Sequence, residues 1–195
     1  MYYYTTYDSI VGMLYLVSKD NKLIGLYIEN QKYFLRNIKD ITLNNNLEIF
    51  IKTKKWLDKY FSGKIVDGNE IPVEFIGTSF QKEVWNILRE IPYGEVITYG
   101  DISKRLCEKR CFNNMSSQAV GGAVGKNPIS IIVPCHRVVG VNHRLVGYAG
   151  GIDKKIQFSS LKIYCRRRVW IFPYNSWKPG LHQASFCVIV VAMAA

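Results

Sequence analysis

A cysteine followed directly by a histidine and an arginine is the group of residues in this chain best suited to chemistry. Cys135, His136 and Arg137 come immediately after Pro134. A thiol is nucleophilic only as the thiolate, and a neighbouring histidine can take its proton while an arginine supplies a fixed positive charge. The sequence therefore indicates nucleophilic chemistry at Cys135, although a buried cysteine that only fills space in the core fits the same residues.

The apolar run before this cysteine predicts the element that positions it. Residues 129–133 are four β-branched apolar residues and one serine, a composition typical of a buried strand. Pro134 cannot donate a hydrogen bond to a neighbouring strand, so pairing should stop there. We expect a buried strand that ends at Pro134 and leaves Cys135 at the wall of the core.

The residues around Cys135 resemble the active-site signature of the O6-alkylguanine-DNA alkyltransferases, also called methylated-DNA–protein-cysteine methyltransferases. The signature is Pro-Cys-His-Arg-Val at 134–138, and the resemblance extends from about residue 75 to residue 156. Further matching segments are Gly-Thr-Ser-Phe-Gln at 77–81, Ile-Pro-Tyr-Gly at 91–94, Thr-Tyr-Gly at 98–100, Ala-Val-Gly-Gly-Ala at 119–123 and Gly-Tyr-Ala-Gly-Gly at 147–151. The resemblance implies DNA repair, in which the methyl group of O6-methylguanine passes irreversibly to the protein's own cysteine, with O4-methylthymine as a second candidate lesion.

The resemblance implies three catalytic residues. Cys135 is the implied nucleophile, His136 the base that takes its proton through a water molecule, and Tyr99 the hydroxyl that relieves charge near N3 of the leaving guanine. The alternative for Tyr99 is a core tyrosine whose hydroxyl has a protein partner. The methyl group comes from the damaged DNA, so no cofactor is expected, and no metal site is expected either.

Further residues are implied to hold the lesion and its DNA. They are Ser117, Gln118, Ala119, Gly121, Gly122, Asn127, Val138, Val139 and Tyr148. Asn127 is implied to brace the active-site turn and Tyr148 to lie beside the alkyl group, while the two valines contact the base through backbone groups. A helix C-cap and a core tyrosine are the plain alternatives for Asn127 and Tyr148. Arg137 we interpret as a structural residue.

Three helices are predicted in this part of the chain. Residues 78–91 carry an apolar stripe behind a Thr-x-x-Gln capping box, and Thr98 with Asp101 caps a second, shorter helix. The third, residues 116–126, contains three glycines, each of which costs about 1 kcal/mol relative to alanine inside a helix. Its small residues suggest a face left bare either for DNA or for another helix.

The order helix, turn, small-residue helix is that of a helix-turn-helix. The resemblance implies that the second helix enters the minor groove of double-stranded DNA, where a side chain at its start fills the gap left by an extruded base. The family has an arginine at the position of Gln118. We therefore expect weaker holding of the orphaned base partner in this chain.

The N-terminal third predicts a small sheet with one helix and nothing that suggests chemistry. Residues 11–17 and 23–28 alternate in polarity around a polar turn and predict a hairpin, to which residues 2–6 add a strand. Residues 47–61 have helical spacing and are followed by Gly63, a helix-ending residue. Its tyrosines are expected in the core or at its rim, and residues 66–71 are expected to form a linker.

We therefore expect an α/β (α+β) protein with two domains and an atypical end. Residues 1–73 would form a domain whose ribonuclease-H-like shape is implied by the resemblance. Residues 74–157 would form the DNA-binding alkyltransferase domain, with a winged-helix-like helix-turn-helix. Residues 158–195 are expected to form a tail unlike the family.

That tail lacks a residue that the resemblance requires. The family continues with a leucine-rich helix whose glutamate orients the active-site histidine, but no acidic residue follows Asp153 here. Plausible codons for residues 159–165, read two bases out of phase, yield Leu-Lys-Leu-Glu-Asn-Ile-Leu, so we hypothesise a frameshift near Gln157. The missing glutamate favours the alternative of a non-catalytic, lesion-binding remnant. A Cys-His hydrolase is a weaker alternative, because no orienting Asn or Asp is visible.

Charge and composition limit the kinds of partner and the cellular compartment that we expect. Lys and Arg number 10 against 9 acidic residues in residues 1–74, 12 against 6 in residues 75–165 and 4 against none beyond, for a net charge of +11. A basic C-terminal part suits a DNA backbone. With no apolar run of membrane-spanning length, no signal peptide and five cysteines without a Cys-x-x-Cys pair, we expect a cytoplasmic monomer that does not bind membranes.

Overall fold

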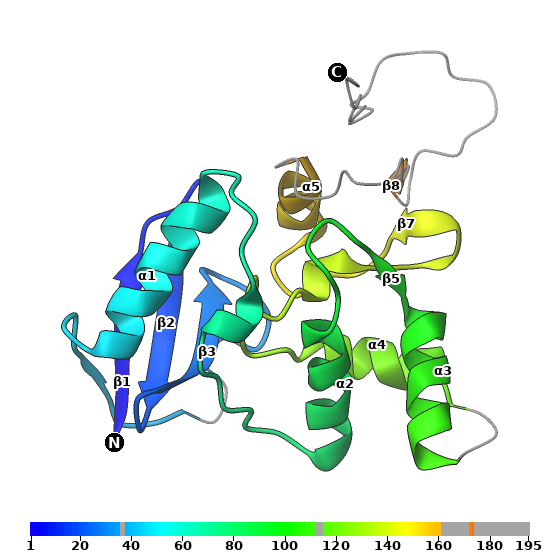
Figure 1. The fold of residues 1–195 in the computed structure, drawn as a ribbon, viewed down its shortest axis with the longest axis horizontal. Coiled ribbons are helices and arrows are strands. Elements are labelled where there is room, and N and C mark those ends of the chain that lie inside the picture. The colour runs from blue at the N-terminus through cyan, green and yellow to red at the C-terminus, as the bar shows by residue number, and fades with distance from the viewer. Residues whose placement is uncertain (36–37, 112–114, 161–171, 174–195) are drawn as a thin grey trace.

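The N-terminal part is a four-stranded sheet covered on one face by a helix (Figure 1). The computed structural model describes residues 1–35, 38–111, 115–160 and 172–173. The strands are β1 (Tyr2–Tyr7), β2 (Leu14–Lys19), β3 (Lys22–Ile28) and β4 (Ile41–Leu43), in the order β3-β2-β1-β4. β1 runs antiparallel to β2 and parallel to β4, and β2 and β3 form the predicted hairpin. Residues 11–13, expected to begin the second strand, form a turn instead.

The covering helix is α1 (Glu48–Phe61), and it turns its apolar side toward the sheet. Its inward face includes Phe50, Leu57 and Tyr60, each at most 1% exposed. The helix ends just before Gly63, as predicted from the sequence. Gly63 has φ +78°, a left-handed conformation that glycine adopts readily after the last turn of a helix. In addition, the amide of Gly63 donates to the carbonyl of Tyr60 at 3.1 Å.

The C-terminal part is helical, and both predicted capping boxes are present. Its helices are α2 (Ser79–Arg89), α3 (Tyr99–Arg110), α4 (Ser117–Gly125) and α5 (Ile152–Ser160). Short elements connect them: η1 (Gly68–Glu70), β5 (Ile97–Thr98), η2 (Cys135–Arg137), β6 (Val138–Val139), η3 (Val141–His143), β7 (Arg144–Leu145) and β8 (Phe172–Pro173). α4 packs against both α2 and α3, so α3 and α4 are the two helices of the expected helix-turn-helix.

The predicted strand at residues 129–133 is absent, and a turn takes its place. Ile129 makes a single parallel bridge with Leu26, residues 130–132 form a turn, and Ile131 has φ +71°. That value is an outlier for a β-branched residue. The physical reason lies outside the run: the side chain of Asn127 satisfies backbone groups that a neighbouring strand would otherwise have bonded.

The two halves are joined along the edge of β3. The amide of Leu23 donates to the carbonyl of Pro72 at 2.9 Å, and the amide of Leu26 donates to the carbonyl of Pro128 at 2.9 Å. The predicted linker, residues 66–71, contains η1 and ends in Ile71, which is buried. One core of contacting buried residues extends through both halves.

The last described helix brings a residue of the expected atypical tail into the core. Phe158, in α5, is fully buried. The rest of that tail, residues 161–171 and 174–195, lies outside the described residues. Within the described part of the chain, no helix has the length and apolar character needed to cross a membrane.

Candidate active site

Asn127 organises the turn that presents Cys135. Its side chain is 3% exposed and follows the end of α4. Its Nδ2 donates to the carbonyl of Val133 at 2.9 Å and lies 3.1 Å from Sγ of Cys135, while its Oδ1 accepts from the amide of Ile129 at 3.0 Å. One side chain therefore holds the backbone of the turn and contacts the thiol.

Cys135 is the first residue of η2, and its side chain is 4% exposed. Burial raises the pKa of the Cys135 thiol, because the thiolate loses its hydration. A hydrogen bond from Asn127, the positive charge of Lys155 and a hydrogen bond with Tyr148 act in the opposite direction. The balance keeps the thiol protonated at rest and surrounds it with groups that favour the thiolate.

His136 is a neutral imidazole in this site. It is 1% exposed, and burial, followed by the positive charges of Arg137 and Lys155, holds its pKa well below the ordinary value. Its Nε2 lies 3.4 Å from the hydroxyl of Tyr60, and its ring lies 5.0 Å from the ring of Phe158, between centroids. A neutral imidazole beside a protonated thiol can accept the proton of that thiol.

Lys155 contributes a buried positive charge that sequence reasoning missed. Its side chain is fully buried, and Nζ donates to the carbonyls of Val138 at 2.7 Å, Val146 at 2.9 Å and Gly147 at 3.3 Å. Burial lowers its pKa to about 8, whereas the Cys135 thiolate favours its charged form. The available signal was its spacing, since Lys155 lies three positions before Phe158 on one face of α5.

A cavity of about 320 Å³ has Cys135 in its wall. Of the other expected residues, Tyr99, Gly121, Gly122 and Tyr148 line it. Its volume lies at the lower end of the range for small-molecule sites, which suits one flat base. The structure thus brings the thiol, both tyrosines and the three glycines of α4 around one space.

Tyr99 is a protonated hydrogen-bond donor in this cavity. Its hydroxyl donates to the carbonyl of Val146 at 3.3 Å. Burial, with a smaller effect of Cys135, raises its pKa to about 12, so the phenol keeps its proton at neutral pH. The ring of Tyr148 packs edge-on against Phe158, with centroids 6.2 Å apart.

The start of α4 is exposed, as a DNA-facing surface requires. Ser117, Gln118 and Ala119 are all exposed, and Val120 beneath them is fully buried. A Cβ added at Gly122 would meet no atom of the described chain within 4 Å, and one at Gly121 would lie 3.7 Å from the ring of Tyr99, an ordinary contact. Close packing of another helix therefore does not account for these glycines.

Some expected residues lie behind the cavity and do not line it. Val138 and Val139 form β6, are fully buried and pair with β5. The carbonyl of Val138 already accepts from Lys155. Asn127 and His136 likewise do not line the cavity.

Arg137 has structural contacts, in agreement with our interpretation of it as a structural residue. Its partners are two backbone carbonyls and an aromatic ring. It is 6% exposed, and its Nη1 donates to the carbonyls of Ile91 at 3.3 Å and Pro92 at 3.2 Å. Its guanidinium also lies 5.4 Å from the ring centroid of Tyr93.

The N-terminal part contributes two residues to the cavity, and sequence reasoning singled out neither of them. Lys32 and Tyr33, in the loop after β3, line the same cavity as Cys135. The amide of Lys32 donates to the carbonyl of Ala149 at 2.8 Å. The hydroxyl of Ser130 lies 3.3 Å from Oε1 of the buried Gln31, which ties this loop to the active-site turn. No local pattern marks these residues, because their role depends on a contact with a distant segment.

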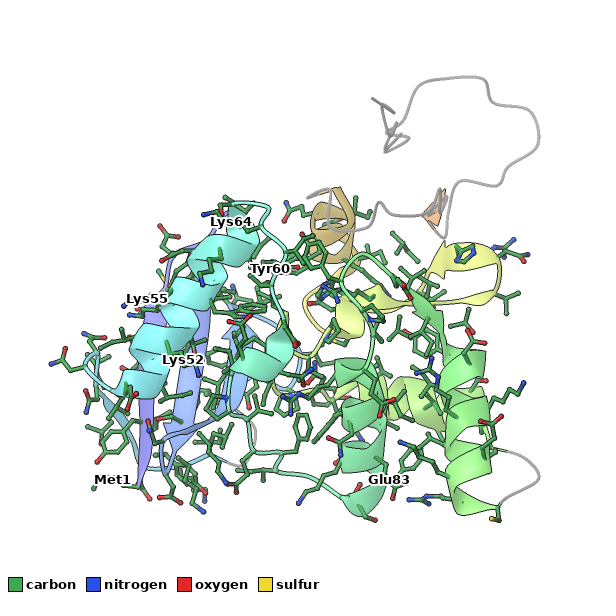
Figure 2. The ribbon with its side chains drawn as sticks, viewed as in Figure 1. Met1, Lys52, Lys55, Tyr60, Lys64 and Glu83 are labelled. Carbon is green, nitrogen blue, oxygen red and sulfur yellow. The ribbon has the colours of Figure 1, made fainter. Side chains whose placement is uncertain are left out.

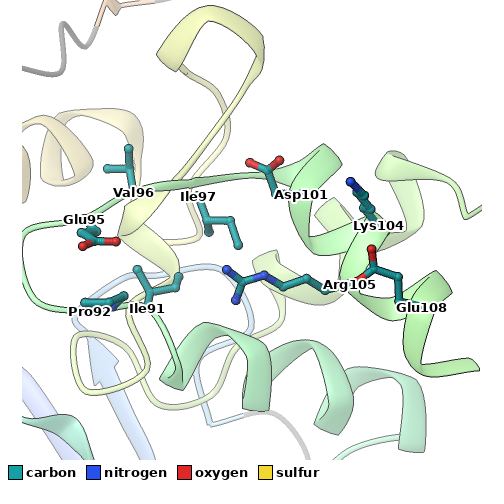
Figure 3. Close-up of a pocket in the computed structure, with 9 residues that line it drawn as sticks. All are labelled: Ile91, Pro92, Glu95, Val96, Ile97, Asp101, Lys104, Arg105 and Glu108. Atoms are coloured by element: carbon teal, nitrogen blue, oxygen red, sulfur yellow. The ribbon is translucent and has the colours of Figure 1, made fainter.

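A second cavity, of about 360 Å³, lies between α3 and the segment before it (Figure 3). Asp101, Lys104, Arg105 and Glu108 reach it from α3, and Ile91 and Ile97 line its other side. Its charges are of both signs, and none of the expected site residues lines it. The cavity at Cys135 is therefore the candidate active site.

Comparison with known proteins agrees with this site. Residues 79–161 match the DNA-binding domain of 6-O-methylguanine DNA methyltransferase, and residues 2–75 match its ribonuclease-like domain. The methylated-DNA–protein-cysteine methyltransferase of Haemophilus influenzae is 40% identical over 153 residues, which cover 78% of this chain and 82% of that protein. The protein of the same name from Methanosarcina acetivorans is 41% identical over 157 residues, covering 78% and 93%.

A solved structure shows the same fold. The OGT protein of Mycobacterium tuberculosis in complex with DNA superposes with a TM-score of 0.72 at 35% identity, covering 82% of this chain and 92% of that one. This chain therefore belongs to the methylated-DNA–protein-cysteine methyltransferases, a family of DNA-repair enzymes.

Proposed function

We propose that this protein repairs O6-methylguanine in double-stranded DNA by transferring the methyl group to Sγ of Cys135, once per molecule. One observation carries the proposal. The protonated thiol of Cys135 lies in the wall of a cavity about the size of one nucleobase, where it accepts a hydrogen bond from Asn127 and is followed in the chain by the neutral His136. A thiol, a base and a space for one flat substrate are what an in-line displacement at a methyl group requires.

The reaction begins with removal of the thiol proton. The S–H bond of Cys135 breaks, His136 receives the proton through a water molecule, and the electron pair stays on sulfur. The thiolate attacks the methyl carbon, an S–C bond forms, and the C–O6 bond breaks with its electrons passing to the guanine. Tyr99, which keeps its proton because burial raises its pKa to about 12, turns its hydroxyl away from the carbonyl of Val146 and donates toward N3 of the leaving base. Guanine finally takes up one proton, so none is gained or lost overall.

The product explains the single turnover. The sulfur of S-methylcysteine is a thioether, which has no proton to lose and no tendency to give up its methyl group. Among the described residues the other free cysteines are Cys107, which is partly buried, and Cys111, which is exposed. Neither lines the cavity of Cys135.

The exposed start of α4 supports DNA binding by this surface. Its first residues are small or polar, and the bare face at Gly122 allows a DNA backbone to approach closely. Gln118 stands where an extruded base would leave a gap. Because glutamine is shorter than arginine and uncharged, we expect it to fill that gap with fewer contacts.

The alternative of a non-catalytic remnant is not favoured. The relatives are named as methyltransferases, and the thiol, its asparagine and its histidine are all present in one site. The missing glutamate weakens the support of His136 but leaves the nucleophile in place.

The test is the mass of the intact protein after incubation with a duplex that carries one O6-methylguanine. We expect the mass to rise by one methylene unit in the wild type and to stay unchanged in Cys135→Ala. A duplex with ordinary guanine is the matched control, and one with O4-methylthymine tests the second lesion. Binding of the damaged duplex without any covalent product would refute the proposal.

We also infer that the protein acts as a monomer in the cytoplasm. One chain supplies the thiol, the base and the residues that line the cavity. Light scattering of the protein with and without duplex should give the mass of one chain and of one chain plus one duplex. A stable dimer in both samples would contradict this inference.

A further inference from the structure

A tyrosine of the N-terminal part reaches the active-site histidine. Tyr60, in the last turn of α1, is 1% exposed, and its hydroxyl oxygen lies 3.4 Å from Nε2 of His136, 76 residues further along the chain. Figure 2 shows Tyr60 on the side of α1 that faces the C-terminal half. The ring is held by stacking on Trp56, with centroids 5.4 Å apart, and by an edge contact with Phe61 at 5.2 Å. The hydroxyl therefore has a fixed direction.

Two positive charges lower the pKa of His136. Arg137 follows it directly in η2, and Lys155 comes from α5. Phe158, also from α5, covers the ring at 5.0 Å with an interplanar angle of 31°. No acidic residue follows Asp153, so the carboxylate that the family resemblance implies is absent from the chain. Among the described residues, the hydroxyl of Tyr60 is a polar partner of this imidazole.

We propose that Tyr60 is a positioning residue for methyl transfer, its hydroxyl oxygen accepting the Nε2–H of His136. This proposal rests on the proposed function. With the proton held on Nε2, the lone pair of the neutral ring lies on Nδ1, which is then the atom that takes the thiol proton. The N-terminal part thus takes part in the chemistry through the hydroxyl that fixes the tautomer of the base.

The charged surroundings of Tyr60 fit this role. Burial raises the pKa of Tyr60 well above its ordinary value; Arg137 opposes the rise, and Tyr93 and Cys135 add to it. The phenol of Tyr60 is therefore neutral over the whole pH range of the experiments below. As His136 becomes protonated, the neutral oxygen still accepts from Nε2–H, but it stabilises the imidazolium less than a carboxylate would.

The first test compares two tyrosine variants. Tyr60→Phe keeps the stacked ring and removes only the hydroxyl. Tyr27→Phe is the matched control, because Tyr27 is another buried tyrosine of the same part, its pKa is also raised by burial, and its ring contacts Phe34. Single-turnover methyl transfer to Cys135 is followed by intact mass from about pH 4.5 to 9.5.

We expect Tyr60→Phe to slow methyl transfer about five- to tenfold, the usual effect of losing one hydrogen bond. The acid limb of its pH–rate profile should also move to lower pH, because the protonated imidazole has lost its acceptor and its pKa falls. Tyr27→Phe should keep the wild-type rate and profile. An equal loss of rate in both variants, or a slower Tyr60→Phe with an unmoved profile, would indicate general destabilisation and overturn the proposal.

The second test needs no activity. Nitrogen-15 NMR of histidine-labelled wild type should show His136 as the Nε2–H tautomer, and Tyr60→Phe should show a mixture of tautomers. A wild-type ring protonated on Nδ1 would overturn the role of Tyr60 even if methyl transfer is observed. Conversely, the Nε2–H tautomer in a protein that takes no methyl group would leave Tyr60 as a partner of His136 and refute the proposed function.

Discussion

Burial and nearby positive charge oppose each other on the pKa of Cys135 and act together on the pKa of His136. Burial raises the pKa of Cys135 and lowers that of His136, so both groups are neutral at rest. Asn127 and Lys155 favour the thiolate once it forms. Reactivity therefore depends on proton transfer within the site, and a free thiolate at neutral pH is not needed.

Replacing the base should slow the reaction without removing the nucleophile. We expect His136→Gln to lower the rate of methyl transfer about 100-fold or more, the usual effect of losing a general base. The exposed His143 provides the control, and His143→Gln should keep the wild-type rate. Quenched single-turnover reactions analysed by intact mass give both rates. A His136→Gln variant as fast as the wild type would mean that water alone takes the thiol proton.

The buried lysine should give the reaction a distinctive pH dependence. Because the pKa of Lys155 is about 8, its side chain is charged below that pH and favours the thiolate there. Lys155→Met should therefore slow methyl transfer most at pH 6 to 7, by about tenfold, and the difference from wild type should narrow above about pH 8.

The control for this prediction is the neighbouring lysine. Lys154 extends along the surface to the carbonyl of Glu29 at 3.4 Å, so Lys154→Met should not change the profile. Thermal unfolding of both variants measures the cost of leaving three carbonyls without their donor. A rate ratio of Lys155→Met to wild type that is constant with pH would show that Lys155 acts only through structure.

Among the elements, α4 combines a firmly packed side with a bare one. Val120 is fully buried and Val124 is 4% exposed, which fixes the helix to the core. The bare side, around Gly122, has no close neighbour in the described chain. Retaining glycine there costs helix stability, and DNA binding gives a physical reason for that cost.

A single methyl group on this face should separate stability from DNA binding. Gly122→Ala should raise the free energy of unfolding by about 0.5 to 1 kcal/mol, because alanine loses less backbone entropy in a helix. It should also weaken binding of undamaged duplex, since the methyl group stands where the DNA approaches. Asn86→Ala, on the exposed side of α2, should change the stability slightly and leave duplex binding unchanged. Unchanged affinity in Gly122→Ala would place the DNA surface elsewhere.

At the scale of the whole molecule, the contacts between the two described halves predict that they unfold as one cooperative unit. β3 is hydrogen-bonded to β2 in the N-terminal sheet and also to Pro72 and Pro128 beyond it. The core of buried residues includes Leu26 from the first half and Leu88 from the second. Loss of packing in either half should therefore loosen the active-site turn.

Core truncations in the two halves should have the same kind of effect. Leu26→Ala and Leu88→Ala should each lower the free energy of unfolding by about 2 to 5 kcal/mol and shift one common transition. Denaturation by guanidinium, followed by circular dichroism and tryptophan fluorescence, should give coincident curves. Leu43→Ala, at a leucine that is 54% exposed, is the control and should have little effect. Two separate transitions, each sensitive to one variant, would contradict a single unit.

Local patterns alone predicted the candidate nucleophile, the helices α1 to α4 and the family. The Pro-Cys-His-Arg-Val segment, the two capping boxes and the helical apolar spacings involve residues close together in the chain, and each acts within its own turn or helix. Tertiary structure decided the rest. Asn127 turns an expected strand into a loop, and Lys32, Tyr33, Tyr60 and Lys155 reach the site from segments far from Cys135 in sequence or buried only by packing. The pKa of each ionisable group depends on burial and on the charges that packing brings near it, and neither can be read from one stretch of sequence.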